Sequence, residues 1–424
     1  MSMEITKLAS GLTVVTDAMP ELESAAVGAW VNCGERFETE PVMGVAHMLE
    51  HMAFKGTARR TAKQIAEEIE AVGGDLNAYT GREVTAYHAR VLKADVPLAI
   101  DIIADILLNP AFDKTELERE IGVVIQEIGQ TRDTPDDLIF DYLQEVCYPG
   151  QPMGWPILGT EKTVGGMSRK HLNDFISANY YADGMILAAA GAVDHARVVE
   201  LAKEHFAKIK NGKSSNAKPA RFQGGDKREA GDLEQAHLAF AFPGLASADP
   251  DFFVSQVFST ALGGGMSSRL FQEAREKRGL CYAIYAFTQS YRDGGMIGVY
   301  AGTSEKDAGE IAPIVADEMA ALASGATEEE TARARAQLKA SLLMGMESPQ
   351  TRCEQMTGHL YVFGRLLTVD ELIARIDAVD VSALRRFAER ICARGEPAMA
   401  ALGPVKRLES RNKFAARFGR VKAA

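Results

Sequence analysis

One stretch, Gly44-Val45-Ala46-His47-Met48-Leu49-Glu50-His51-Met52-Ala53-Phe54, organises the rest of this chain. Its residue pattern predicts one short helix. Apart from His47, Glu50 and His51 the stretch is apolar on every side, so we expect the helix to be buried. Burying three ionisable groups so close together costs on the order of several kcal/mol unless a partner compensates their charge. A divalent cation would be such a partner.

The spacing of the two histidines supports a metal site. On a helix, His47 and His51 are four residues apart and project from one face, one above the other. Glu50 lies on the same side, one position before the second histidine. This places two imidazoles on a metal ion and a carboxylate beside the water that the metal holds. The sequence H-x-x-E-H is the inverted zinc-protease motif, so we predict a zinc ion here.

Length, composition and charge restrict the class of protein. A chain of 424 residues is too long for one ordinary core and predicts two or three domains. Hydrophobic content of 46% with 25% charged residues is typical of a soluble globular protein, and no apolar run approaches the roughly 20 residues that span a membrane. The net charge of −11 argues against general affinity for nucleic acid and is compatible with basic peptide substrates.

The first residues and the cysteines favour a reducing compartment. The first residues carry neither a secretory signal nor the Arg-rich pattern of an organelle transit peptide. The five cysteines are scattered and form no C-x-x-C pair, so neither a disulfide framework nor a thiolate zinc site is indicated. We therefore expect a cytoplasmic protein.

Strands and helices alternate along the first half of the chain. Apolar periodicity predicts a hairpin from residues 4–7 and 12–16, further strands at 25–33, 75–80, 83–92 and 184–192, and helices at 61–72, 94–108, 114–131, 135–146, 168–179 and 194–209. The polar stretch that follows, up to residue 234, predicts a linker between domains.

The second half repeats this order. Strands are predicted at 280–289 and 295–302 and helices at 304–322 and 327–344, followed by Pro349, which corresponds to Pro135. In this register Ser341 replaces Glu127 and Ala334 replaces Glu120, and nothing replaces the two histidines. We infer an α+β protein with two homologous domains, each a mostly antiparallel β-sheet packed with α-helices. The predicted domains are residues 1–210 with the metal site, a linker at 211–234, and residues 235–424 without it.

The helix at 114–131 offers a third metal ligand. A catalytic zinc ion needs one protein ligand besides the two histidines and keeps a position for water. Glu120 and Glu127 are two turns apart on one stripe that borders the apolar face. From geometry alone, either glutamate could be the ligand.

Several segments together resemble one family. The chain resembles the pitrilysin/insulinase (M16) zinc metallopeptidases over nearly its whole length, in particular the short-chain branch that includes the mitochondrial processing peptidase β-subunit and its bacterial relatives. The resemblance rests on the H-x-x-E-H motif with Glu127 lying 76 positions beyond His51, on Phe54-Lys55-Gly56-Thr57, on Asn77-Ala78-Tyr79-Thr80, and on Arg275 with Tyr282 in the second half.

The resemblance implies an activity and a role for each matching residue. Glu127 is expected to be the third zinc ligand and Glu120 a nearby group that supports the site, with one zinc ion per chain. The implied reaction is hydrolysis of short, unfolded or presequence-like peptides by a zinc-activated water, with Glu50 as the general base.

Substrate contacts are expected on a strand. The segment 75–79 has small or turn-like residues at its middle, which suits an edge strand that binds an extended peptide through backbone hydrogen bonds. The family uses the equivalent strand in this way, which implies that Asn77, Ala78 and Tyr79, together with Phe54, contact the substrate.

The Arg/Tyr pair implies a second copy of the chain. In the family, the residues that match Arg275 and Tyr282 contact substrate and stabilise the oxyanion. In long members this pair comes from the half opposite the zinc, and this chain is only one such half. We therefore predict that the pair acts in trans across a homodimer that encloses a chamber. The alternatives are the catalytic half of an obligate heterodimer and a non-catalytic scaffold subunit of a larger complex.

Overall fold

A computed structural model describes residues 2–213, 215–394 and 396–418. The chain forms two compact units, and neither is continuous in sequence. Unit 1 contains Met1–Gln130, Trp155–Lys218 and Met344–Leu366, and unit 2 contains Thr131–Gly154, Pro219–Leu343 and Leu367–Ala424.

The sheet of unit 1 has six strands in the order β1-β2-β6-β3-β5-β4. These are β1 (Ser2–Lys7), β2 (Thr13–Ala18), β3 (Ser24–Val31), β4 (Asp75–Thr80), β5 (Thr85–Leu92) and β6 (Met185–Gly191). All pairs are antiparallel except β2 with β6. The predicted hairpin and strands are confirmed, and β4 lies at an edge of the sheet.

Two helical layers cover this sheet. Alternate residues of a strand face opposite sides, so Val14 and Val27 enter one core while Val15 and Ala26 enter another. The first core is closed mainly by α1 (Val45–Ala53), α3 (Val96–Leu108), α7 (Arg169–Asn179) and α8 (His195–His205). The buried helix predicted around the H-x-x-E-H motif is α1, and it lies in this layer.

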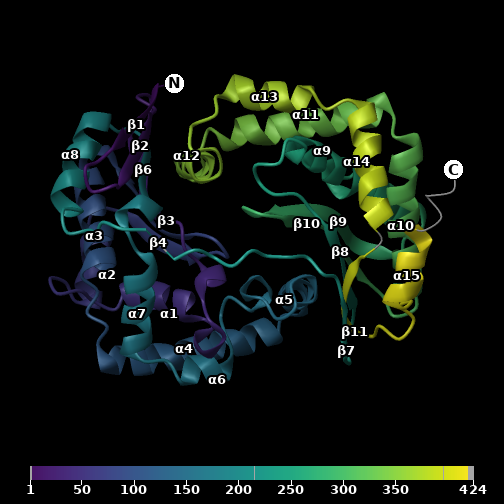
Figure 1. Ribbon diagram of the computed structural model, residues 1–424, viewed down its shortest axis with the longest axis horizontal. Helices are drawn as coiled ribbons and strands as arrows, with labels where there is room; N and C mark the ends of the chain where they lie inside the picture. Colours follow the sequence, from purple (N-terminus) through teal and green to yellow (C-terminus); the bar gives the residue numbers. More distant parts are fainter. Residues whose placement is uncertain (1, 214, 395, 419–424) are drawn as a thin grey trace. The chain divides into compact units, whose positions relative to one another are not determined.

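The opposite face of this sheet is covered by α12 (Pro349–Phe363), a helix from the second half of the chain. In Figure 1 this helix is yellow-green, whereas the strands that it covers are purple to teal. Cys353 and Met356 are buried against the strands. Arg352 forms an ion pair with Asp17, which is 1% exposed, and the hydroxyl of Tyr361 donates to the carbonyl of Trp30 at 2.7 Å. Apolar packing and a buried charge pair therefore fix α12 on unit 1.

The sheet of unit 2 repeats this topology. Its order is β7-β11-β8-β10-β9, formed by β7 (Asp226–Ala230), β8 (Ala236–Pro243), β9 (Cys281–Ser290), β10 (Gly295–Thr303) and β11 (Ala398–Gly403). The parallel pair is β7 with β11, in the position of β2 with β6. Five consecutive strands thus pair in the same order and direction in both units. The α+β fold with two mostly antiparallel sheets is confirmed.

The helices of unit 2 also form two layers. One face of the sheet packs on α9 (Phe252–Gly263), α10 (Ala308–Gly325), α14 (Val381–Arg394) and α15 (Arg411–Phe418). The other face packs on α5 (Pro135–Cys147), which comes from the first half of the chain and is blue in Figure 1. Pro135 and Pro349 each begin their helix, as the predicted register requires. The two halves of the sequence therefore exchange equivalent helices.

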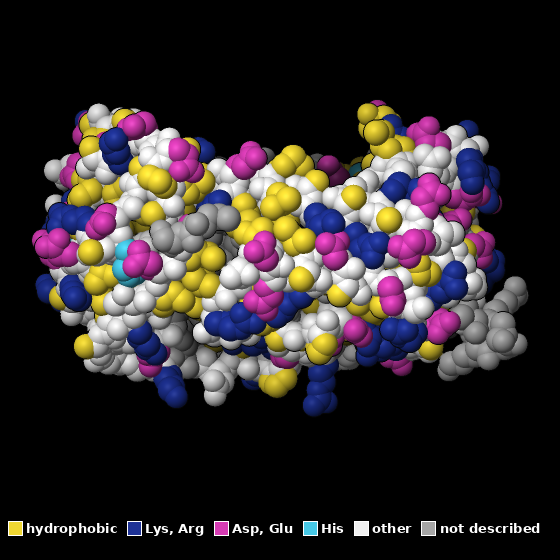
Figure 2. Space-filling view, turned by 90° about the horizontal axis from the view of Figure 1, so that it is seen from above, with side chains coloured by type: hydrophobic (Ala, Val, Ile, Leu, Met, Phe, Trp, Pro, Cys, Tyr) yellow, Lys and Arg dark blue, Asp and Glu magenta, His cyan; other side chains and the backbone are white. Residues whose placement is uncertain are grey.

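The remaining helices are α2 (Ala62–Glu70), α4 (Lys114–Arg132), α6 (Glu161–Gly165), α11 (Glu328–Gly345) and α13 (Val369–Asp377). The ranges that were predicted agree to within a few residues, although α8 ends at His205 and β7 lies inside the predicted linker between residues 211 and 234. No ranges were predicted for α6, α9, α12 to α15, β8 and β11. None of the described helices is long and apolar enough to cross a membrane. On the face that Figure 2 shows, acidic and basic side chains are intermixed over much of the surface.

Candidate metal centre and active site

The start of α1 is fixed by a buried carboxylate. Glu38 accepts hydrogen bonds from the backbone N–H groups of Gly44 at 2.7 Å and Ala46 at 2.8 Å, which are orphan donors at the helix N-terminus. Burial raises the pKa of Glu38 well above its usual value, although these two bonds act in the opposite direction. Gly44 has a φ of 87°, and a Cβ there would lie 2.6 Å from the carbonyl oxygen of Leu158. These contacts fix the N-terminus of α1 at Gly44, and with it the position of the histidines that follow.

Two histidines of α1 and one glutamate of α4 form a cluster. The Nε2 atoms of His47 and His51 lie 3.8 Å and 3.5 Å from Oε2 of Glu127. One ligand atom from each residue lies within 4.8 Å of the other two. The structure thus brings together the three residues that were predicted to hold the metal.

The cluster fits a zinc ion better than a set of direct contacts. Distances of 3.5 Å and 3.8 Å are too long for good hydrogen bonds. Ligands about 2.1 Å from a tetrahedral ion are roughly 3.4 Å apart, close to these values. Burial, together with the neighbouring His51, lowers the pKa of His47 to about 4. His47 is therefore neutral at pH 7, so its approach to Glu127 is not an ion pair and its nitrogen lone pair is free for a metal.

Glu120 contacts the other side of His51. Its Oε2 lies 2.9 Å from Nδ1 of His51, and its Oε1 lies 2.7 Å from Nζ of Lys55. Burial alone would raise the pKa of Glu120, but the bonds to Lys55 and His51 outweigh it and the pKa is lowered. We assign the Nδ1 proton of His51 to this bond, which leaves Nε2 free to bind a metal.

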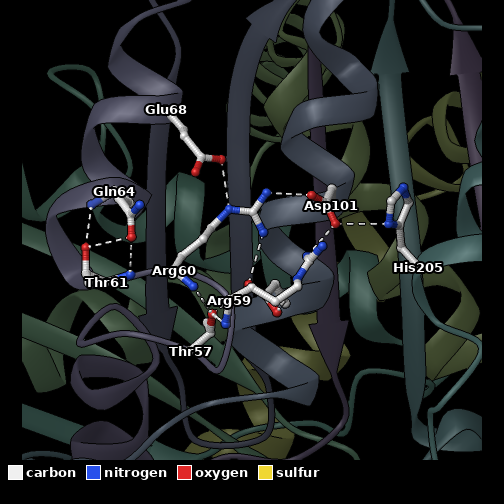
Figure 3. A network of polar contacts seen from close by, with 9 residues as sticks. Thr57, Arg59, Arg60, Thr61, Gln64, Glu68, Asp101 and His205 are labelled. Carbon is white, nitrogen blue, oxygen red and sulfur yellow. Dashed lines mark hydrogen bonds and ion pairs between the residues drawn. The ribbon is translucent and has the colours of Figure 1, made fainter.

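The loop after α1 is tied to α3 by the network of polar contacts in Figure 3. Arg60 pairs with Asp101 at 2.5 Å and with Asp105 at 3.0 Å, and Arg59 pairs with Asp105 at 3.0 Å. The hydroxyl of Thr57 donates to Asp105 at 2.7 Å. These bonds hold the loop that carries Lys55, and they thereby support the contact between Lys55 and Glu120.

Glu50 is half-buried on α1 and is not part of the metal cluster. Its Oε2 accepts a hydrogen bond of 2.6 Å from the hydroxyl of Thr80, the last residue of β4. The pKa of Glu50 is raised, because the effect of burial exceeds that of the hydrogen bonds from Thr80, which lower it. The carboxylate is therefore held in place by a neutral donor.

The predicted substrate residues lie on β4 and at the end of α1. The side-chain oxygen of Asn77 accepts the N–H of Ala78 at 2.8 Å, so this edge N–H is held by a side chain. The hydroxyl of Tyr79, which is 38% exposed, accepts from the indole of Trp30 at 3.2 Å. Phe54 caps the C-terminus of α1 and is half-buried against the core.

Arg275 and Tyr282 lie together in unit 2, whereas the metal cluster belongs to unit 1. Arg275 is on a π-helix (Phe271–Lys277), and its guanidinium lies 4.6 Å from the ring centre of Phe271 and 4.9 Å from that of Tyr282. Tyr282 is on β9 and is 78% exposed. The Arg/Tyr pair is thus preformed and open to solvent in the single chain.

Four contacts of the site had no sequence signal of their own. Lys55 and Thr80 stand in the segments that carry the family resemblance, but their residue types did not distinguish them from ordinary loop and strand residues. Glu38 and Phe271 stand outside every motif. Only the tertiary structure shows which polar atoms Lys55, Thr80 and Glu38 contact.

Comparisons with known proteins show which family this chain matches. The family model described as insulinase (peptidase family M16) matches residues 13–161, and that of the peptidase M16 inactive domain matches residues 166–338. A protein of Rickettsia felis called an uncharacterized zinc protease is 38% identical over 92% of this chain and 95% of its own length. A probable mitochondrial-processing peptidase subunit beta of Arabidopsis thaliana is 37% identical over 97% of this chain and 80% of its own length.

The fold is also similar to that of a solved structure. The crystal structure of a protease from Helicobacter pylori superposes with a TM-score of 0.87 at 23% identity, covering 95% of this chain and 99% of the other.

Proposed function

Because the chain belongs to the insulinase family of peptidases (peptidase family M16), we propose that it is a zinc-dependent endopeptidase that cleaves short, unfolded or presequence-like peptides. The observation that carries this proposal is the cluster of His47, His51 and Glu127 with Glu50 on the same helix as the two histidines. A scaffold subunit would need neither a complete ligand set nor a carboxylate beside it.

Each residue of this site has a separate role in the proposed reaction. His47, His51 and Glu127 would hold one zinc ion per chain, and zinc in such a site activates water and polarises a carbonyl. Glu50 accepts the proton of the attacking water and returns a proton to the leaving amine. Glu120 keeps His51 in the tautomer that binds through Nε2.

The substrate would add to β4 as an extra strand. An edge strand offers unpaired backbone groups, and β4 is at the edge of its sheet. A substrate carbonyl would replace the side chain of Asn77 as the acceptor for the N–H of Ala78. This mode of binding reads the backbone, so we expect a loose sequence preference. The net charge of −11 favours basic peptides among the substrates.

A peptide library tests the proposed activity. We expect the purified protein to cut unstructured peptides at internal bonds, to lose this activity with a zinc chelator, and to regain it when zinc is added back. Mass spectrometry of the fragments gives the cut sites. Cleavage that survives complete zinc removal, or zinc-loaded protein that cuts no peptide, would contradict the proposal.

The Arg275–Tyr282 pair would complete the site of a second protomer. We propose a cytoplasmic homodimer in which this pair contacts substrate and stabilises the oxyanion at the zinc site of the partner. The exposure of Tyr282 in the single chain supports this assignment, because a tyrosine that is 78% exposed can contact another molecule.

Mixing two inactive variants tests the action in trans. Glu50→Gln removes the base, and Tyr282→Phe removes the oxyanion contact. After subunit exchange at equal amounts, half of the dimers are mixed and each has one complete site, so roughly a quarter of the wild-type activity should return. Native mass spectrometry verifies the exchange. Mixed dimers without recovered activity would show that the pair acts within its own chain.

A further inference from the structure

The general base is held by the strand that we assign to the substrate. Thr80 ends β4, and its hydroxyl has two acceptors within reach. Oε2 of Glu50 is 2.6 Å away, whereas the carbonyl oxygen of Ala46 is 3.5 Å away. A hydroxyl has one hydrogen to donate. The shorter distance assigns that hydrogen to Glu50.

This bond defines the orientation of the carboxylate. The hydroxyl donates to Oε2 of Glu50, and the backbone of Thr80 also hydrogen-bonds to this carboxylate, so one residue of β4 holds it at two points. Threonine is branched at Cβ, so its hydroxyl direction follows closely from the position of the strand backbone. A change in the position of β4 is therefore passed directly to Glu50. None of the metal-cluster residues makes a hydrogen bond with Thr80 among the contacts described for it.

We propose that Thr80 is a positioning residue whose hydroxyl aims the Glu50 carboxylate relative to the peptide bound on β4. The strand that receives the substrate then also fixes the base that cleaves it. This inference rests on the proposed peptidase function and adds a residue to it. It predicts that Thr80 acts on the rate of the chemical step, because neither zinc binding nor the backbone bonds of the strand use its hydroxyl.

Three variants separate this role from strand stability. Thr80→Val keeps the shape of the side chain and removes the hydroxyl, and Thr80→Ser keeps the hydroxyl. Thr85 is directly opposite Thr80 on β5, but its hydroxyl donates to the carbonyl of Cys33 at 2.9 Å. Thr85→Val is therefore a matched control that removes a strand hydroxyl without reaching Glu50.

We expect Thr80→Val to lower kcat by about 10- to 100-fold with little change in KM, because a small misplacement of a reacting group costs that much. Zinc content should stay at the wild-type level. Thr80→Ser should restore most of kcat, and Thr85→Val should keep the wild-type kcat even if it melts earlier. A wild-type kcat in Thr80→Val, or equal losses in all three variants, would overturn the proposal.

Binding of acetohydroxamate to the zinc-loaded protein gives a reading that needs no turnover. A hydroxamate chelates zinc and shares its acidic proton with a carboxylate beside the metal, so calorimetry should show weaker binding for Thr80→Val than for wild type and Thr80→Ser. If wild type cuts no peptide but this difference persists, the peptidase assignment fails and the role of Thr80 stands. If wild type cuts peptides and Thr80→Val matches it in both assays, the role of Thr80 alone fails.

Discussion

Glu50→Gln is expected to lower the rate of peptide hydrolysis by about 10²- to 10⁴-fold, the usual contribution of a general acid or base. Glutamine keeps the size of the side chain and can accept the hydrogen bond from Thr80, but it cannot take a proton from water at neutral pH. Because Glu50 is not in the metal cluster, zinc content should stay at the wild-type level. Single-turnover cleavage of a fluorogenic peptide together with metal analysis measures both quantities.

Glu118→Gln provides the control for this substitution. Glu118 lies on α4 with a side chain that is 64% exposed and pairs only weakly with Lys114, at 3.7 Å. Loss of its charge should leave the cleavage rate unchanged. If Glu50→Gln bound zinc and cleaved peptides at the wild-type rate, Glu50 would not be the base.

Glu127→Gln is expected to weaken zinc binding by more than about 100-fold, whereas Glu120→Gln should weaken it by about 10- to 100-fold, the range typical of residues that support a ligand. An amide is a poor zinc ligand, so replacing Glu127 removes one of three protein ligands. Replacing Glu120 keeps all three but loosens the orientation of His51. Competition with a chelator of known affinity measures the two constants, and activity should follow zinc occupancy.

The pair of substitutions decides between the two glutamates. They lie on the same helix seven residues apart and both reach His51, so each serves as the control for the other. The reverse order of zinc affinities would make Glu120 the ligand and Glu127 the supporting group. Equal and small losses would contradict a zinc site that includes either glutamate.

The sequence predicted the elements of the site because the spacing of residues within a helix or strand fixes which side chains share a face. His47 and His51 are one turn apart, and Glu120 and Glu127 are two turns apart, so each pair was correctly placed on one side. Helix geometry alone could not choose between the two glutamates, and only the family resemblance favoured Glu127 as the ligand. His51 has two ring nitrogens, and the structure shows Nδ1 facing Glu120 and Nε2 facing Glu127.

Long-range partners could not be predicted in the same way. The match of Pro349 to Pro135 indicates that the segment after Pro349 corresponds to the segment after Pro135, but it does not show which sheet either segment covers. Arg352 illustrates the limit, because an arginine within a helix is usually at the surface, and its partner Asp17 lies far away in sequence. The role inferred for Thr80 is likewise invisible in a residue type that is common in strands.

The exchange of α5 and α12 has a consequence for how the chain is made. During synthesis the strands of unit 1 leave the ribosome long before Pro349–Phe363. The side chains of Val15, Trp30 and Ile186 therefore stay exposed until α12 has been made and can pack on them. The helix α5 is made early, and its apolar side chains stay exposed until the strands of unit 2 have been made. A chain interrupted before Pro349 therefore leaves this apolar face uncovered, and we expect such a chain to aggregate or to be degraded. We therefore expect a chain that stops before Pro349 to contain all residues of the metal cluster but to leave one face of the supporting sheet exposed.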